Sequence, residues 1–141
     1  MEQFVEFVTN HIILAGAFIA ILTLLFIELF GAKLKGYPAV SPGEATQLIN
    51  REDAVVLDIR EDNEYHGGHI VNSIHIPMGY LKDRQGELEK FKTKPIIAVC
   101  RSGNRSGAAC SQLKKAGFDN IYNLKGGMMA WQHASLPIDK S

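Results

Sequence analysis

A nearly unbroken apolar run near the N-terminus constrains the fold of this chain more than any other feature. Residues 12–30 contain one charged side chain, Glu28, and one hydroxyl side chain, Thr23. A helix of this length rises about 28 Å, close to the hydrocarbon thickness of a bilayer. The run therefore predicts a single transmembrane helix over 12–30, with Glu28 near enough to one end to reach water.

The flanks of the run favour a retained membrane anchor over a cleaved signal peptide. Signal peptides begin with a basic segment and end at a small-residue cleavage site, whereas residues 1–11 carry Glu2 and Glu6 and no lysine or arginine. Lys33 and Lys35 follow the run. Because basic flanks stay on the cytoplasmic side, we expect a single-pass protein of the inner membrane. Its N-terminus would lie outside and its C-terminal domain in the cytoplasm.

Charge and cysteine content narrow the possible partners. The 141 residues include 15 Lys and Arg against 15 Asp and Glu, and this neutral balance gives no electrostatic footprint for nucleic acid. Cys100 and Cys110 lie ten positions apart, without C-x-x-C or Cys/His ligand spacing. His66 and His69 have no third ligand nearby. The sequence therefore predicts no nucleic-acid partner, no disulfide framework and no metal site.

Strand-like and helix-like segments alternate after a linker over 31–40. This alternation predicts an α/β fold with a mainly parallel sheet flanked by helices. The expected strands are 54–58, 73–77, 96–100 and 121–124, and the expected helices are 42–50, 61–66, part of 81–91, 106–116 and a short last helix that contains Trp131. Ser41 is expected to cap the first of these helices, because Pro42 and Glu44 follow it in a capping-box pattern.

Cys100 ends the apolar strand 96–100 and precedes a short loop and a helix. Ligands of open α/β sheets bind at this edge, where a helix N-terminus and free backbone N–H groups converge. Such surroundings lower the pKa of a thiol, so we interpret Cys100 as a nucleophile. The candidate binding loop that follows consists of Arg101, Ser102, Gly103, Asn104 and Arg105. Ser106 is expected to cap the next helix.

Asp58 and Arg60 follow the strand 54–58 and are candidate supporting residues. A carboxylate beside a thiolate would raise the pKa of the thiol and oppose its chemistry. We therefore expect Asp58 to have a structural role, paired with loop N–H groups or with Arg60. Cys110 lies on the apolar side of the helix 106–116 and is interpreted as a core residue.

Three blocks of sequence resemble the rhodanese family. Residues 57–70 (LDIREDNEYHGGHI) and 73–77 (SIHIP) are similar to the family pattern D-x-R … E-[YF]-x-x-G-H-I … A-x-x-[IL]-P, with Ser73 in place of the usual alanine. The loop from Cys100 to Arg105 has the length of the family's active-site loop. Residues 124–131 (LKGGMMAW) resemble L-x-G-G-[IM]-x-x-W. An anchor before one such domain is similar to the membrane-anchored single-domain rhodaneses of bacteria.

The resemblance implies a rhodanese-like fold over 41–137, with a tail over 138–141, and a sulfurtransferase activity. Cys100 would take sulfur from a donor such as thiosulfate, form a persulfide and pass the sulfur to a thiol or to cyanide. The loop N–H groups would stabilise the anionic sulfur, and Arg101 would guide an anionic donor. No cofactor is expected beyond the covalent persulfide.

Two other functions stay open at this stage. A phosphatase or arsenate reductase uses the same fold, but related phosphatases carry one more residue in the loop. A membrane-tethered interaction module would explain the anchor, because a tether adds nothing to the turnover of a small soluble donor. Its partner would be a membrane protein, and the lipid bilayer is a partner under every interpretation.

Overall fold

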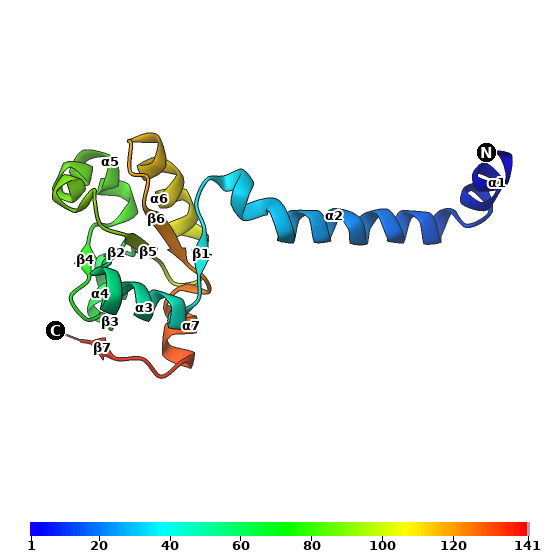
Figure 1. The fold of residues 1–141 in the computed structure, drawn as a ribbon. Helices are drawn as coiled ribbons and strands as arrows, with labels where there is room; N and C mark the ends of the chain where they lie inside the picture. Colours follow the sequence, from blue (N-terminus) through cyan, green and yellow to red (C-terminus); the bar gives the residue numbers. More distant parts are fainter. Residues whose placement is uncertain (141) are drawn as a thin grey trace. The chain divides into compact units, whose positions relative to one another are not determined.

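The computed structural model describes residues 1–140, apart from the side chains of Ala32 and Lys33. The predicted orientation of the span uses Lys33, whose side chain lies outside the described part of the chain. The chain separates into two compact units, Met1–Leu34 and the residues from Lys35 onward (Figure 1). The second unit contains every strand among the described residues.

The N-terminal unit consists of two helices, α1 (Glu2–Asn10) and α2 (Ile12–Lys35). Within α2, the stretch Ile12–Gly31 is long and apolar enough to cross a membrane, and none of it is buried. The hydroxyl of Thr23 donates to the carbonyl of Ile19 at 2.8 Å, so this polar group is satisfied inside the helix. The sequence analysis predicts no element before residue 12, whereas the structure has α1 there.

Five short strands form one parallel sheet in the order β1-β6-β5-β2-β4. They are β1 (Ala39–Val40), β2 (Val55–Asp58), β4 (Ile74–His75), β5 (Ile96–Val99) and β6 (Ile121–Leu124). The prediction of a mainly parallel sheet is confirmed. Every residue of β5 is buried, which fits its place in the middle of the sheet. A separate antiparallel pair joins β3 (His69–Ile70) to β7 (Ile138–Asp139).

Helices cover both faces of the sheet (Figure 1). They are α3 (Pro42–Glu52), α4 (Asp62–His66), α5 (Leu81–Arg84), α6 (Asn104–Lys115) and α7 (Gly127–His133), with 3₁₀ segments η1 (Met78–Tyr80) and η2 (Gln85–Phe91). The expected cap of α3 is confirmed, because the Glu44 N–H donates to Ser41 Oγ at 3.2 Å. The helix ends at Glu52 and not at Asn50.

Side chains of β5 alternate between two hydrophobic clusters, as the period of a strand requires. Ile96, Ala98 and Cys100 pack in one cluster, with Leu113 of α6. Ile97 and Val99 pack in the other, with Trp131 of α7. The alternation places the Cys100 side chain on the α6 side of the sheet, next to the start of that helix.

Candidate active site

Cys100 directly follows β5 and is fully buried. The Gly103 N–H donates to Cys100 Sγ at 3.0 Å, and the Ser106 hydroxyl lies 3.3 Å from the same sulfur. Burial raises the pKa of the Cys100 thiol. The Ser106 hydroxyl and the N–H groups of Ser106, Gly103 and Ser102 lower it by more, so its pKa falls below the ordinary value of 9.0. These donors favour the thiolate, which is the nucleophilic form of cysteine.

The prediction that Ser106 caps α6 is wrong. The cap is Gly103, whose φ of 102° lies in the left-handed region that glycine adopts readily. The helix begins at Asn104, two residues earlier than the sequence suggests, and Ser106 lies in its first turn. The side chain of Ser106 is therefore free to face the thiol and does not bond the backbone of its own helix.

Asn123 of β6 fixes both the hydroxyl of Ser106 and the loop backbone. Ser106 Oγ lies 2.5 Å from Asn123 Oδ1, and the Asn123 amide donates to the carbonyl of Gly103 at 3.0 Å. A hydroxyl has one proton, so Ser106 donates either to Asn123 or to Cys100 Sγ at a given moment. The sequence analysis missed Asn123. Its signal is a polar side chain in the strand that neighbours β5.

The glycine pair before α7 brings that helix against the loop. The N–H of Met128 donates to the carbonyl of Cys100 at 2.8 Å, and the N–H of Met129 donates to that of Arg101 at 3.1 Å. Gly127 has a φ of 56°, and a Cβ there would lie 2.3 Å from the Cys100 carbonyl oxygen. Glycine is therefore required for this close approach. Two orphan N–H groups of α7 therefore hold the consecutive carbonyls of Cys100 and Arg101.

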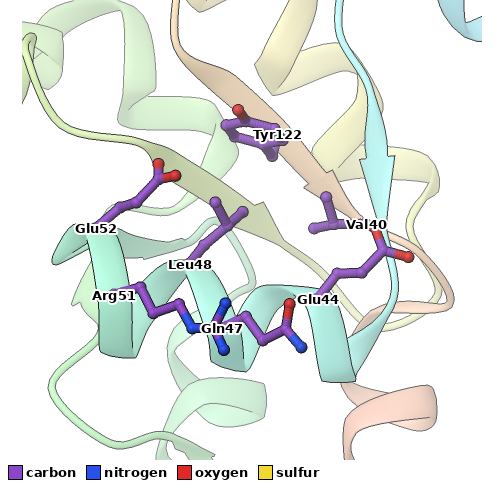
Figure 2. Close-up of a pocket in the computed structure, with 7 residues that line it drawn as sticks. All are labelled: Val40, Glu44, Gln47, Leu48, Arg51, Glu52 and Tyr122. Atoms are coloured by element: carbon purple, nitrogen blue, oxygen red, sulfur yellow. The ribbon is translucent and has the colours of Figure 1, made fainter.

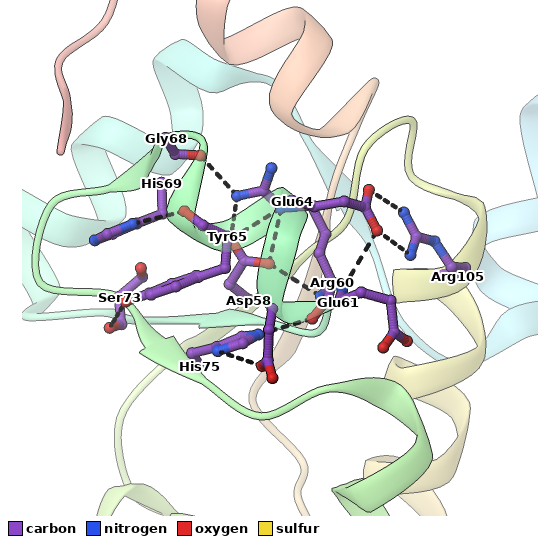
Figure 3. A network of polar contacts seen from close by, with 11 residues as sticks. Asp58, Arg60, Glu61, Glu64, Tyr65, Gly68, His69, Ser73, His75 and Arg105 are labelled. Carbon is purple, nitrogen blue, oxygen red and sulfur yellow. Dashed lines mark hydrogen bonds and ion pairs between the residues drawn. The ribbon is translucent and has the colours of Figure 1, made fainter. Parts of the chain in front are cut away.

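Arg105, at the far end of the loop, is held by Glu64 of α4. Its Nη1 and Nη2 donate to the two carboxylate oxygens of Glu64, each at 2.8 Å (Figure 3). The hydrogen bonds from Arg105 lower the pKa of Glu64 to about 2, and those to Glu64 raise the pKa of Arg105. The bidentate pair connects α4 to the loop. The sequence analysis did not single out Glu64.

Asp58 and Arg60 form a buried ion pair beneath this region. Arg60 Nε and Nη2 donate to the two carboxylate oxygens of Asp58 at 2.9 and 2.7 Å, and Nη2 also donates to the carbonyl of Gly68 at 2.9 Å. Of the two partners considered for Asp58, the structure has Arg60 (Figure 3). The pair joins the end of β2 to the segment before β3.

Tyr65 is stacked between two histidines. Its ring centroid lies 3.8 Å from that of His69 and 4.1 Å from that of His75, with nearly parallel planes. His69 Nδ1 bonds the carbonyl of Tyr65 at 2.9 Å, and His75 Nε2 bonds that of Arg60 at 2.7 Å (Figure 3). Within residues 1–140, no group of three His, Cys, Asp or Glu side chains is placed to hold a metal ion.

A cavity of about 310 Å³ lies beside the loop. Arg101 lines it and is exposed, and its guanidinium has no hydrogen-bond or ion-pair partner among the described residues. The other lining residues are Arg60, Asn63, Glu64, Gly67, Gly68, Met128, Met129 and Gln132. Cys100 is not one of them. The cavity therefore reaches the loop at Arg101, while the thiol stays beneath the loop backbone.

A second cavity of about 290 Å³ lies between α3 and the β1–β6 edge (Figure 2). Val40 and Tyr122 line it from the strands, and Glu44, Gln47, Leu48, Arg51 and Glu52 line it from α3. It shares no residue with the Cys100 loop or with the first cavity. Val40, Leu48 and Tyr122 pack with one hydrophobic cluster and Cys100 packs in the other, so this cavity and the thiol lie on opposite faces of the sheet.

Cys110 is buried in the middle of α6. Its Sγ donates to the carbonyl of Tyr122 at 3.4 Å. Burial raises the pKa of Cys110 to about 12, and the nearby Cys100 contributes in the same direction. A protonated thiol facing an acceptor is a core residue, as the sequence analysis expects.

The chain belongs to the rhodanese-like domain family, whose profile matches residues 41–134. It is 39% identical over 139 residues to the uncharacterised protein YibN of Escherichia coli, which covers 98% of this chain and 97% of the relative. It is 36% identical over 95 residues to the thiosulfate sulfurtransferase GlpE of Pseudoalteromonas translucida, covering 67% and 89%. Both the family and the rhodanese-like fold predicted from the sequence are confirmed.

Among solved structures, a rhodanese-related protein from Thermoplasma volcanium is similar to this chain. The TM-score is 0.68 at 32% identity, and the match covers 74% of this chain and all of the other. The similarity to YibN extends over nearly the whole chain, whereas that to the Thermoplasma protein is confined to about three quarters of it.

Proposed function

We propose that this protein is a sulfurtransferase that carries sulfur as a persulfide on Cys100. The observation that carries the proposal is the set of donors aimed at one buried sulfur. The Gly103 N–H lies 3.0 Å from Cys100 Sγ and the Ser106 hydroxyl 3.3 Å from it, and together with neighbouring N–H groups they lower the pKa of the thiol. Family membership and relatives named thiosulfate sulfurtransferase support the same chemistry.

Thiosulfate is the proposed donor. The Cys100 thiolate attacks the outer sulfur, a new S–S bond forms, and the bond between the two thiosulfate sulfurs breaks. Sulfite leaves with the electron pair of the broken bond, and the persulfide retains one negative charge. Cyanide or a thiolate then attacks the terminal sulfur and releases Cys100 as a thiolate. No external oxidant or reductant is needed for the transfer to cyanide, which yields thiocyanate.

The loop supports this chemistry through fixed donors. The N–H groups of Ser102, Gly103 and Ser106 bond the Cys100 sulfur. Together with the other N–H groups of the segment from Arg101 to Arg105, they would stabilise the charge of the terminal persulfide sulfur as it forms. Arg101 has a free guanidinium at the edge of the loop, where it would attract a dianionic donor. Arg105 is already engaged by Glu64 and would hold the loop in shape. No resident cofactor takes part.

We place the protein in the inner membrane, with the rhodanese-like domain in the cytoplasm. The stretch Ile12–Gly31 has the length and composition of a span, and Lys33 and Lys35 follow it while no lysine or arginine precedes it. A free catalytic thiol also fits a reducing compartment. Reaction of single cysteines introduced before and after the span with an impermeant reagent, in intact cells, tests this orientation.

The persulfide is tested by incubating the purified full chain in detergent with thiosulfate and measuring its intact mass under native conditions. We expect a gain of one sulfur atom that cyanide removes. Cys100→Ser should show no gain, and the matched control Cys110→Ala should show the same gain as the unsubstituted chain. A folded chain whose Cys100 reacts with an alkylating reagent but never gains sulfur from thiosulfate would contradict the proposed donor chemistry.

A second candidate function is a membrane-tethered interaction module, which α2 favours because small soluble donors do not require a tether. The two functions are separated in cells by the chain without residues 1–35 and by Cys100→Ser. If docking is the main task, the deletion abolishes the cellular phenotype and Cys100→Ser does not. If sulfur transfer is the main task, Cys100→Ser abolishes it.

A further inference from the structure

Helix α1 has two distinct faces. Its helical positions advance by about 100° each, which gathers Phe4, Phe7, Val8 and Val5 on one side together with the preceding Met1. The opposite side carries Glu2, Gln3, Glu6, Thr9 and Asn10. The two sets do not interleave, so the apolar side forms one continuous stripe of the kind that is covered in an amphipathic helix.

Nothing in the described part of the chain covers this stripe. Phe4 is 70% exposed, Val5 59% and Phe7 58%, and α1 has no buried residue. The hydroxyl of Thr9 on the other face bonds carbonyls of its own helix. A contiguous exposed apolar stripe on a short helix indicates a partner outside the chain.

The position of α1 next to α2 indicates what that partner is. Only His11 separates the two helices, and its φ of −128° and ψ of 46° break the helical path. The stripe of α1 is thus joined directly to a helix whose apolar side chains are exposed all around. Glu2 and Glu6 keep α1 from continuing the span into hydrocarbon, because isolated carboxylates are costly there.

We propose that α1 lies flat in the membrane interface, at the end of the span formed by α2, with its apolar stripe toward the acyl chains. The inference rests on the proposed membrane span. The surface it fits is zwitterionic phospholipid, because its polar face has two carboxylates and no basic side chain that would bind an anionic headgroup. The chain would then be anchored in the membrane by two helices joined at His11, the transmembrane helix α2 and the interfacial helix α1.

The experiment uses the full chain in phosphatidylcholine vesicles and single tryptophan substitutions in the N-terminal unit. Phe4→Trp reports the apolar stripe, and Gln3→Trp, its uncharged neighbour on the polar face, is the matched control. Leu22→Trp reports the middle of the span. Trp131 is the only native tryptophan, and its signal is subtracted using the unsubstituted chain. Quenching by aqueous acrylamide and by lipids brominated at shallow or deep positions gives the depth of each probe.

We expect acrylamide to quench Phe4→Trp several-fold less than Gln3→Trp, and shallow bromines to quench Phe4→Trp more than deep ones. Equal aqueous quenching of the two probes would overturn the proposal. Strong quenching of both by deep bromines would also overturn it, since α1 would then extend the span. Protection of Phe4→Trp from acrylamide without quenching by any lipid would also overturn the proposal. It would indicate that a second copy of the chain covers the stripe. Failure of Leu22→Trp to respond to deep bromines would instead overturn the proposed span itself.

Discussion

Cys100 and Cys110 share one hydrophobic cluster and are both fully buried, yet their thiols are held in opposite ways. At the end of β5, the Cys100 sulfur faces donors from Gly103 and Ser106. In the middle of α6, the Cys110 sulfur faces the carbonyl of Tyr122. The pKa of Cys100 is lowered, and that of Cys110 is raised to about 12.

The difference shows that burial alone does not decide whether a cysteine is reactive. Desolvation raises the pKa of both thiols. At Cys110 a single backbone N–H opposes this rise, whereas at Cys100 the Ser106 hydroxyl and the N–H groups of Ser106, Gly103 and Ser102 together outweigh it.

Removal of each sulfur in turn gives the largest expected effect. Cys100→Ser should reduce thiocyanate formation from thiosulfate and cyanide to the rate without protein, because the persulfide cannot form. Cys110→Ala should retain the activity, since its thiol stays protonated at neutral pH. The assay is the initial rate of thiocyanate production by the full chain in detergent. Equal losses in the two variants would remove the distinction between the cysteines.

Gly127→Ala should displace the loop. The new Cβ would lie within 2.6 Å of three backbone atoms of Cys100 and Arg101, and Gly127 already has a positive φ. We expect the free energy of unfolding to fall by about 1–3 kcal/mol and the pKa of Cys100 to rise. Denaturant unfolding followed by Trp131 fluorescence measures the first quantity. Gly86→Ala is the matched control, because a Cβ at Gly86 meets nothing within 4 Å.

Ser106→Ala should raise the pKa of Cys100 while leaving the backbone donors in place. The thiolate fraction falls tenfold for each unit of pKa, so alkylation of Cys100 at pH 7 should slow by up to about tenfold. Ser111→Ala, also in α6 and without a hydrogen bond to Cys100 among the described residues, should leave the rate unchanged. A Ser106→Ala variant as reactive as the unsubstituted chain would assign the lowered pKa to the backbone N–H groups alone.

Glu64→Gln should give the smallest effect, a decrease in the free energy of unfolding that depends on pH. The pKa of Glu64 is lowered from 4.5 to about 2 in the folded protein. Its ionised form therefore stabilises the fold at pH values above about 4.5, and the contribution is lost as the pH falls toward about 2. We expect the variant to be less stable by about 1–2 kcal/mol near pH 6, with a difference that shrinks on acidification.

The control for this prediction is Glu87→Gln. Glu87 also pairs with an arginine, but both side chains are about half exposed, so the substitution should change stability little. Denaturant unfolding of the three proteins between pH 6 and pH 3 makes the comparison. A difference between Glu64→Gln and the unsubstituted chain that grows on acidification would contradict the assigned role of the Arg105–Glu64 pair.

Most of the framework could be predicted from local sequence. Apolar runs mark β2, β5 and β6, and glycine, proline and capping residues mark the turns and the start of α3. The position of Cys100 at the end of the central strand follows from the same patterns. These features depend on residues within a few positions of one another, and a single sequence displays such patterns directly.

The partners of the loop could not be predicted in this way. Glu64 lies 41 positions from Arg105, and Asn123 lies 17 positions from Ser106, so the fold alone brings them together. The sequence predicts the start of α6 two residues late, because Asn104 and Arg105 resemble loop residues. The helix begins at Asn104 because Gly103, in a left-handed conformation, is its cap. Strands β3 and β7 have two residues each, too few to show a period.

The most direct test of the central contrast is a pH titration of thiolate absorbance in the full chain, compared with Cys100→Ser and Cys110→Ala. The account predicts one thiolate that forms below the ordinary cysteine pKa of 9.0, is missing in Cys100→Ser and is unchanged in Cys110→Ala. The second thiolate should form only near pH 12. A Cys100 that titrates at or above 9.0 while the domain stays folded would contradict the claim that the loop donors outweigh burial.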